Sequence, residues 1–336
     1  MSATSVTSGG LPSWLSPALD RLHRQHRTGR LHHAVLLAGP PGLGKGLLAD
    51  ALARALLCSG EPERPCGACP ACRLTEAGTH PDYRRLRPEA KEKEGEGSIV
   101  IDRVRDLLAF MQLSPQMGGA RVAVITPAER MNRSAANSLL KFLEEPPHGV
   151  QLILTTANPR RLPPTVRSRC ALVPLPPPPR EEALEWLGRQ SESDAETRRL
   201  ALALAAGMPL AAQALLESGG VEQFGVARRH LGELAAGRDP LPLARHWEKE
   251  PRRLVRWLML LVGDLLRTRA GGKPSALARR DVEALTGAAG NDFLLHQLLE
   301  RLVEHARALE QPLNGRLAAE AVLLDTATAW KRGGRR

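Results

Sequence analysis

The first residues that suggest chemistry form a glycine-rich run with one lysine, GPPGLGKG, which begins at Gly39. Its spacing fits a phosphate-binding loop, in which backbone N–H groups surround phosphate oxygens and the lysine contacts the outer phosphates. The candidate nucleotide contacts are Gly39, Gly42, Gly44 and Lys45. The hydroxyl residue that normally follows the lysine and holds Mg²⁺ is replaced by Gly46, which has no ligand atom. The run therefore predicts a degenerate phosphate loop.

A hydrolysing phosphate loop also needs an acidic residue at the end of a neighbouring strand, to hold Mg²⁺ and polarise water. The apolar run RVAVI instead ends in Thr126 and Pro127, and the nearest carboxylate is that of Glu129. The sequence therefore departs from the pattern at both metal-handling positions. We expect no ATP hydrolysis by this chain, while weak or vestigial ATP binding through Lys45 and the glycines stays open.

Four of the five cysteines fall in one short segment, as Cys58, Cys66, Cys69 and Cys72. Thiolates at this spacing can close a tetrahedral zinc site, and an all-cysteine site leaves no position open for a substrate. We therefore predict structural Zn²⁺. His80 is an alternative fourth ligand, an iron–sulfur cluster is an alternative occupant, and reduced, unliganded thiols are the simplest alternative. Disulfides are not expected, because the sequence has no export signal.

The composition restricts the class of protein. The 336 residues suffice for two or three domains with their own cores. The formal charge of +11 favours a nucleic-acid partner, but an arginine-rich composition explains it equally well, and 3% aromatic residues leave few stacking platforms for bases. No apolar run is long enough for a membrane span, and the N-terminus has no secretory pattern. We therefore expect a cytoplasmic protein without membrane contact.

The hydrophobic pattern indicates which regular elements must position these residues. Short apolar runs at 32–39, 120–126 and 150–156 predict strands, and CALVPL predicts a further one. KGLLADALARALL, after the phosphate loop, and SAANSLLKFLEE, between two strands, have helical periodicity. This alternation predicts an α/β domain with a parallel sheet. The charged segment 89–98 has no apolar period, and we expect a mobile, solvated loop there.

The domain boundaries follow from changes in composition. The run PPPP at 176–179 can neither continue a sheet nor begin deep inside a helix, and we interpret it as a stiff spacer. From Arg180 onward the pattern is helical, with a break at Gly219 and Gly220. We predict three domains, namely 1–177 with the phosphate loop and a zinc module at 58–72, a small helical domain at 178–218, and a helical C-terminal domain at 219–336.

The first domain contains, in this order, the motifs GPPGLGKG, CGACPAC, GTHPDY, NSLLKFLEEPP and TVRSRC. Together they resemble the delta-prime family of bacterial DNA polymerase III clamp-loader subunits, which belongs to the AAA+ class. The resemblance is detailed in the first domain and continues only in AAGMPLAAQALL and LNGRLAAEAVLL beyond it. It implies a P-loop-type AAA+ domain with an inserted zinc module, a helical lid at 178–218 and an all-α collar at 219–336.

The resemblance also implies a function. Members of the family build a heteropentameric ring with delta and gamma or tau subunits, and the ring opens the sliding clamp and places it on primed DNA. Arg169 of TVRSRC would reach the ATP site of a neighbouring subunit as a trans-acting arginine finger. Taken alone, this arginine would be interpreted as a solvated or salt-bridged side chain. The chain itself would be a non-hydrolysing stator within the DNA polymerase III holoenzyme, a DNA-directed DNA polymerase.

Other functions fit parts of the sequence. An ATP-hydrolysing gamma- or tau-like subunit, or another AAA+ replication ATPase, has similar motifs. Three features argue against it, namely Gly46, the missing acids, and GMPLAA, where Leu210 or its neighbours occupy the stretch in which such subunits carry a phosphate-sensing arginine. A DNA-binding zinc module would need basic and aromatic residues, whereas EPERPCGACPACR mixes charges and has no aromatic residue. A free-standing NTPase would hydrolyse ATP in isolation.

Overall fold

The computed structural model describes most of the chain, namely residues 10–60, 65–88, 97–274, 285, 291–311 and 313–331. These residues form two compact units, and the boundary between them falls between Trp186 and Leu187. Buried apolar side chains fill a core in each unit. Of the predicted solvated loop at 89–98, residues 89–96 lie outside the described residues.

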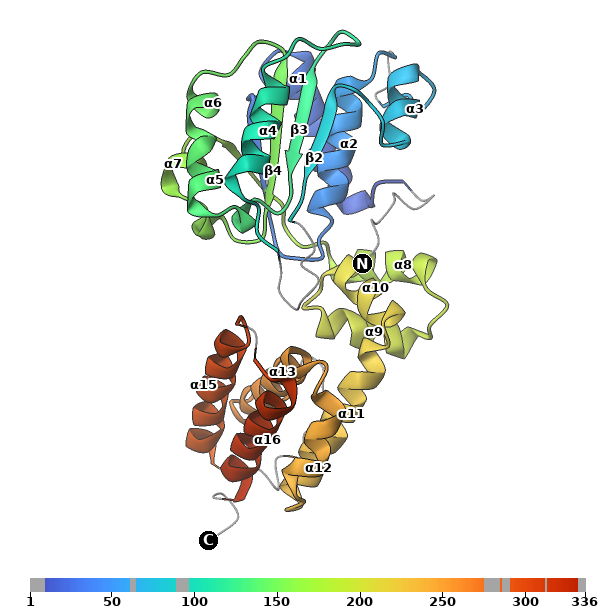
Figure 1. The fold of residues 1–336 in the computed structure, drawn as a ribbon. Coiled ribbons are helices and arrows are strands. Elements are labelled where there is room, and N and C mark those ends of the chain that lie inside the picture. The colour runs from blue at the N-terminus through green and yellow to red at the C-terminus, as the bar shows by residue number, and fades with distance from the viewer. Residues whose placement is uncertain are drawn as a thin grey trace. The chain divides into compact units, whose positions relative to one another are not determined.

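A parallel sheet of five strands forms the centre of the first unit, in the order β2-β3-β4-β1-β5 (Figure 1). The strands are β1 (Ala34–Ala38), β2 (Tyr83–Leu86), β3 (Arg121–Ile125), β4 (Val150–Thr156) and β5 (Ala171–Pro174). Every residue of β1 and β3 is buried, because helices cover both faces, and this explains their continuous apolar sequences. The predicted α/β domain with a parallel sheet is confirmed.

The short strand β2 lies at one edge of the sheet and pairs only with β3 among the described strands. Its sequence, YRRL, combines two arginines with a single buried leucine, Leu86. Such a strand has no continuous apolar run, because an edge position leaves much of it exposed. The sequence pattern therefore does not predict it.

Helices cover the two faces of the sheet (Figure 1). On one face, side chains of α4, α5, α6 and α7 pack against β1, β3 and β4 in a single apolar cluster, while α2 packs against β3 and β4 and is itself covered by α1. The helix predicted from SAANSLLKFLEE is two short helices on either side of Leu139.

The α-helices are α1 (Ser16–Arg27), α2 (Lys45–Leu57), α3 (Pro70–Glu76), α4 (Ile101–Met111), α5 (Arg133–Ser138), α6 (Leu140–Glu144) and α7 (Pro164–Arg167). The 3-10 helices are η1 (Ser13–Leu15), η2 (Ala128–Arg130) and η3 (Pro159–Arg161).

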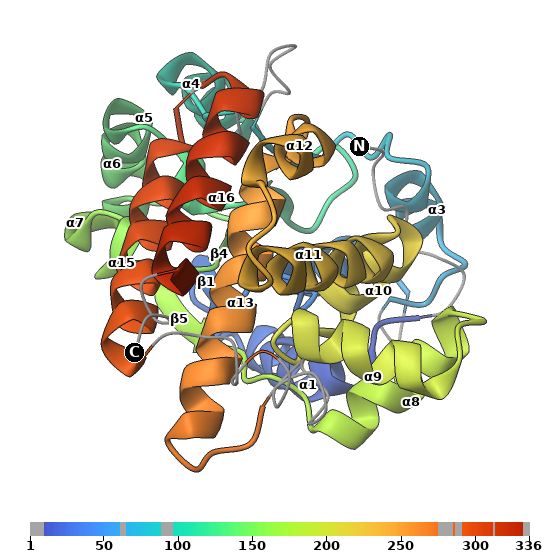
Figure 2. The same cartoon turned by 90° about the horizontal axis from the view of Figure 1, so that it is seen from below.

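The second unit is helical throughout its described residues, and α8 (Arg180–Gln190) spans the boundary between the units. Its core depends on α13, where Leu254, Leu258, Leu261 and Leu265 recur at helical spacing and are all buried. Figures 1 and 2 show α15 and α16 beside this helix. The elements are α9 (Ala195–Leu204), α10 (Pro209–Glu217), α11 (Gly220–Ala235), α12 (Pro240–Ala244), η4 (Arg245–Trp247), α13 (Pro251–Arg269), α15 (Asp292–Ala308) and α16 (Gly315–Lys331).

The predicted boundary between lid and collar, at 218 and 219, does not coincide with the boundary between the two compact units. Both α9 and α10 pack against α11, across the predicted break at Gly219 and Gly220. The two helical domains at 178–218 and 219–336 therefore stay a prediction.

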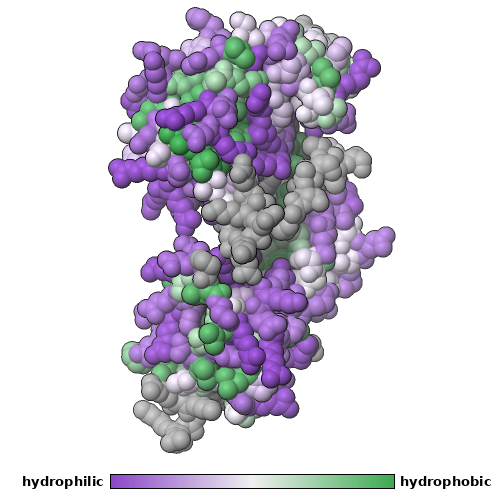
Figure 3. Space-filling model, in the orientation of Figure 1, coloured by the Kyte–Doolittle hydropathy of each residue, from purple (hydrophilic) through white to green (hydrophobic). Residues whose placement is uncertain are grey.

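The surface is mainly polar. Figure 3 shows hydrophilic side chains over most of the visible face of each unit, with separate hydrophobic patches between them. Leu317 and Leu324 of α16 contribute to the exposed apolar surface of the second unit. Within the described ranges, no single helix combines the length and the apolar composition that a bilayer span requires. The pair α9 and α10, bent by 116°, meets those two criteria only when both helices are counted together.

Candidate functional site

The phosphate loop joins the carboxyl end of β1 to the amino end of α2. It begins at Gly39, where a Cβ atom would lie only 2.8 Å from the carbonyl oxygen of Leu175, so no side chain fits there without movement. Gly42 and Gly44 have φ angles of 78° and 100°, a conformation that residues with side chains rarely adopt. The predicted glycines therefore form a tight turn into a helix N-terminus, where backbone N–H groups can face an anion.

Lys45, the first residue of α2, points back onto the loop. Its Nζ donates hydrogen bonds to the carbonyl oxygens of Gly39 at 2.7 Å and Pro40 at 2.8 Å. The residue is only 9% exposed, and this burial lowers the pKa of Lys45, while the nearby carboxylate of Glu129 partly opposes the shift. A phosphate group would have to replace the two carbonyl contacts to engage the ammonium group.

Hydroxyl groups from the ends of β3 and β4 lie where the usual acid would be. The hydroxyl groups of Thr126 and Thr155 share a hydrogen bond of 2.7 Å. Glu129, which follows in η2, accepts a hydrogen bond from the backbone N–H of Ala157 at 2.8 Å through Oε1. Its Oε2 is buried and has no hydrogen-bond partner. Although Glu129 comes late in the sequence, its carboxylate thus lies close enough to Lys45 to influence the pKa of that lysine.

The four predicted cysteines come together in one cluster beside α2 and α3. The Sγ atoms of Cys58, Cys66, Cys69 and Cys72 all lie within 4.8 Å of one another. A tetrahedral zinc site with Zn–S bonds of about 2.3 Å has sulfur atoms about 3.8 Å apart. The Sγ atoms of Cys58 and Cys69 are 3.8 Å apart. The cluster therefore has the donor set and the size that a four-cysteine metal site needs.

The backbone around the cluster suits thiolate ligands. The N–H groups of Cys66, Cys69 and Cys72 each donate to the sulfur of another cysteine of the cluster, at 3.4 Å. Burial disfavours ionisation of Cys69, but hydrogen bonds from Cys72 and Ser59 outweigh it and lower the pKa of Cys69 to about 5. Burial raises the pKa of Cys72 to about 12. A bound cation would favour the ionised form of every thiol in the cluster.

His80, the alternative fourth ligand, is not part of this cluster. Its Nδ1 accepts a hydrogen bond from the backbone N–H of Asp82 at 3.0 Å, and its buried Nε2 has no hydrogen-bond partner. The geometry thus favours the four cysteines over a set that includes this histidine.

Arg169 follows α7, at the start of the segment that leads into β5. Its Nη2 forms an ion pair of 2.7 Å with Oε1 of Glu144, and its Nη1 donates to the carbonyl oxygen of Thr165 at 3.1 Å. The side chains of the ion pair are 37% and 51% exposed, so both remain accessible to solvent. The guanidinium group is held at the surface of the unit by contacts that another anion could replace.

Two contacts of the predicted site residues could not be identified from the sequence. Glu144 belongs to a different motif from Arg169, and only the packing of α6 against α7 brings them together. Arg85 of β2 approaches Gly46 in the first turn of α2. No local pattern of residues could have indicated either pair, because each joins two separate elements of the fold.

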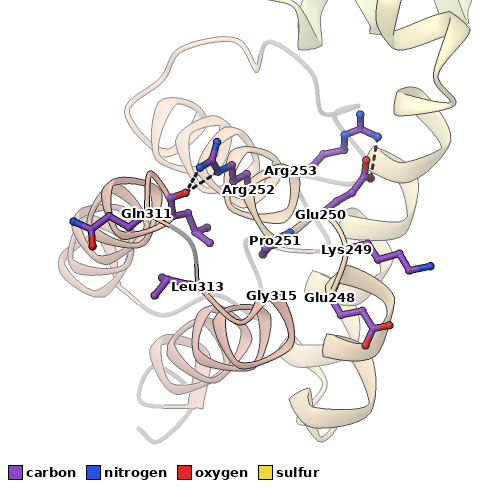
Figure 4. Close-up of a pocket in the computed structure, with 10 residues that line it drawn as sticks. Glu248, Lys249, Glu250, Pro251, Arg252, Arg253, Gln311, Leu313 and Gly315 are labelled. Carbon is purple, nitrogen blue, oxygen red and sulfur yellow. Dashed lines mark hydrogen bonds and ion pairs between the residues drawn. The ribbon is translucent and has the colours of Figure 1, made fainter. Parts of the chain in front are cut away.

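The second unit has a hollow of about 360 Å³ between the start of α13 and the segment that joins α15 to α16 (Figure 4). Arg252 donates from Nε to the carbonyl oxygen of Leu309 at 2.7 Å, and so binds the C-terminal end of α15. A Cβ atom at Gly315 would collide with the carbonyl oxygen of Glu248. The polar contacts at this hollow therefore hold helix ends together.

Comparison with known proteins gives consistent matches. A family model described as "DNA polymerase III, delta subunit" matches residues 14–179. The DNA polymerase III subunit delta' of Escherichia coli K12 is 37% identical over 286 residues, which cover 83% of this chain and 82% of that protein. The subunit delta' of Pseudomonas aeruginosa is 38% identical over 313 residues, covering 88% of this chain and 92% of that protein.

A match to another subunit of DNA polymerase III is more restricted. The DNA polymerase III subunit tau of Escherichia coli K12 is 38% identical over 143 residues, which cover 42% of this chain and 21% of that protein. The similarity to subunit delta' therefore extends over most of both chains, whereas the similarity to tau covers less than half of this one.

Proposed function

Because the chain belongs to the DNA polymerase III delta' subunit family, we propose that it is a non-hydrolysing stator of the clamp-loader complex. In this role it supports ATP-dependent loading of the sliding clamp on primed DNA and supplies Arg169 to the ATP site of a neighbouring subunit. The observation that carries the proposal is the accessible guanidinium group of Arg169, which is held only by an exposed carboxylate and local oxygens.

A guanidinium group near a γ-phosphate stabilises the charge that spreads over the transferring oxygens. In the isolated chain, Glu144 and the carbonyl oxygen of Thr165 occupy the donors of Arg169. Exposed ion pairs of this kind contribute little free energy, about 1 kcal/mol or less. A phosphate group with more negative charge than one carboxylate can therefore take the place of Glu144 when the neighbouring subunit docks.

The rest of the molecule has supporting roles in this proposal. Cys58, Cys66, Cys69 and Cys72 hold structural Zn²⁺, which fixes the segment between α2 and α3. The first unit is an AAA+ domain whose degenerate phosphate loop binds nucleotide weakly or not at all. The segment 178–218 is the lid, and 219–336 joins the collar of a ring with delta and gamma or tau subunits. The chain reaches the clamp and primed DNA through this complex.

The test is a reconstituted loader in which only this subunit carries Arg169→Ala or Arg169→Lys. We expect DNA-stimulated ATPase activity to fall only in part, because other ATP sites keep their own arginines, and clamp loading to fall further. Lysine should not restore activity, since a planar guanidinium fork contacts phosphate in a way that an ammonium group cannot. Arg167→Ala is the matched control, because Arg167 lies in the same motif at the end of α7.

Assembly of each ring is measured first by size, so that a loss of activity is not a loss of the subunit. Unchanged ATPase and loading in an intact Arg169→Ala ring would remove this arginine from the mechanism. ATP turnover by the isolated wild-type chain would instead favour the second candidate, an ATP-hydrolysing subunit, which the intact glycine and lysine geometry of the loop supports.

A further inference from the structure

We propose that Arg85 makes the phosphate loop incompatible with a magnesium-bound nucleotide. Its guanidinium group fills the space beside position 46, where a metal-holding hydroxyl group would lie, and places a positive charge there. The inference concerns this chain's own loop and does not depend on the role of Arg169. It also explains why Gly46 follows Lys45: in this fold, the glycine leaves room for an arginine.

The geometry at Gly46 is the first step. A Cβ atom at this residue would lie 2.9 Å from Nη2 of Arg85, a separation that real Cβ atoms do not show. The arginine belongs to β2, at the edge of the sheet, and its side chain extends to the first turn of α2. In Figure 1 these two elements lie side by side. A serine or threonine at position 46 would therefore meet a guanidinium group before it met a metal ion.

The guanidinium group is held in place, which matters because a free arginine could simply move away. Arg85 forms an ion pair with Oδ2 of Asp50, one turn further along α2. The other oxygen, Oδ1 of Asp50, accepts a hydrogen bond from the hydroxyl group of Tyr83 at 2.8 Å. Both members of the ion pair are 19% exposed. Displacing the arginine would therefore break a connected, half-buried network.

Charge gives the second reason for excluding the metal. Mg²⁺ binds carboxylate, hydroxyl and phosphate oxygens in an octahedral arrangement. Here the position after Lys45 faces a cation, and the hydroxyl group of Thr126, which follows β3, is hydrogen-bonded to that of Thr155 in β4. Even a serine at position 46 could be held by the guanidinium group as an acceptor, which would keep its oxygen from a metal. Position 46 and the paired hydroxyl groups of Thr126 and Thr155 therefore do not fit a magnesium ion.

The experiment measures binding of fluorescently labelled ATP to the full-length isolated chain, with MgCl₂ and in magnesium-free buffer. The proteins are wild type, Gly46→Ser, Arg85→Gln and the double variant. We expect only the double variant to bind ATP more tightly when magnesium is added, by about tenfold or more. Gly46→Ser alone should respond to magnesium no more than wild type does.

Either of two outcomes would overturn the inference. One is magnesium-dependent tightening in Gly46→Ser alone, which would mean that Arg85 is no barrier. The other is a double variant that behaves like wild type, including no binding at all, which would mean that something else excludes the metal. Hydrolysis of ATP by the wild type would contradict the proposed function. Magnesium-dependent tightening of ATP binding by the wild type, without hydrolysis, would contradict only this inference.

Thermal unfolding of the same proteins provides a second readout. Gly46→Ser should lower the melting temperature of the wild type, but the same substitution should not lower the melting temperature of Arg85→Gln. Gly225→Ser is the matched control, because Gly225 is also a helical glycine, but a Cβ atom there would meet nothing within 4 Å. That control should raise the melting temperature slightly, since serine has a higher helix propensity than glycine. If the double variant fails to fold, Arg85→Met with Gly46→Ser replaces it, because methionine is also an unbranched side chain and carries no charge.

Discussion

Two ion pairs of the first unit differ in solvent exposure, and we therefore expect them to contribute differently to stability. Arg169 and Glu144 meet at the surface, where the pair can be exchanged for another contact. Arg121 and Asp82 form an ion pair of 2.9 Å between side chains that are 1% and 0% exposed. The first pair is available for function, while the second is part of the core.

The buried pair leads to a prediction about stability. Asp82 also accepts hydrogen bonds from the backbone N–H groups of Gln116 and Met117, at 2.8 and 2.9 Å, and so holds the loop before β3. Replacing Asp82 with alanine leaves Arg121 buried and unpaired. We expect Asp82→Ala to lower the free energy of unfolding by about 3–5 kcal/mol, measured by denaturant unfolding.

Glu144→Gln is the control for this prediction, because it removes a carboxylate from an exposed ion pair. We expect it to change the free energy of unfolding by less than about 1 kcal/mol. Equal losses in Asp82→Ala and Glu144→Gln would show that burial does not determine the contribution of these pairs.

At the scale of elements, the segment between α2 and α3 depends on its cysteines. Cys58 directly follows α2, and Cys69 is the N-cap of α3, where its sulfur accepts a hydrogen bond from the N–H of Cys72. A metal ion that binds these thiolates would join the end of one helix to the start of the next. Metal binding and local folding are therefore expected to be coupled.

We predict one zinc ion per chain, retained through gel filtration. Cys69→Ser should release most of it and make the segment after Cys58 more sensitive to protease. Elemental analysis and limited proteolysis are the measurements. Cys170→Ser is the matched control, because Cys170 lies apart from the cluster and donates to the carbonyl oxygen of Val166 at 3.3 Å.

Two results would contradict the zinc prediction. A stable wild-type protein without metal would mean that the thiols are unliganded. A brown protein with iron and sulfide would mean that the cluster binds iron and sulfur instead.

At the scale of the whole molecule, the two units have separate cores but different relations to the proposed ring. The sheet of the first unit is complete without any residue after Pro174, and the unit ends at Trp186. The second unit has only helices among its described residues, with exposed apolar side chains such as Leu317 and Leu324 on α16. In the proposed ring this unit makes the subunit contacts, and such side chains would be covered there.

Truncation after Ser218 tests whether the helical C-terminal segment is needed for assembly with the other subunits. We expect the fragment to keep its metal and the cooperative unfolding of the first unit, but not to assemble with the other subunits. Because α9 and α10 lose their packing against α11, the fragment should also expose apolar surface. Circular dichroism and gel filtration with the partner subunits are the measurements. Assembly of the fragment as strongly as the full chain would contradict the collar assignment.

The features that depend on local patterns can be predicted from the sequence. Continuous apolar runs predict β1, β3 and β4, because buried parallel strands need apolar residues on both faces. The glycines of the phosphate loop and the four neighbouring cysteines are also recognisable, since their geometry requires little beyond their own segments. The family resemblance added a role for Arg169 that its local surroundings could not indicate.

Contacts between distant segments depend on how the chain folds and cannot be predicted from local patterns. The sheet order brings β2 beside β3, so that Arg85 meets the first turn of α2 and fills the space beside Gly46. Packing of α6 and α7 brings Glu144 to Arg169, and the same fold buries Asp82 with Arg121. No fixed separation along the sequence predicts these pairs, because they depend on which elements become neighbours in the fold. The missing hydroxyl group after Lys45 is visible in the sequence, but the arginine beside it appears only when the chain is folded.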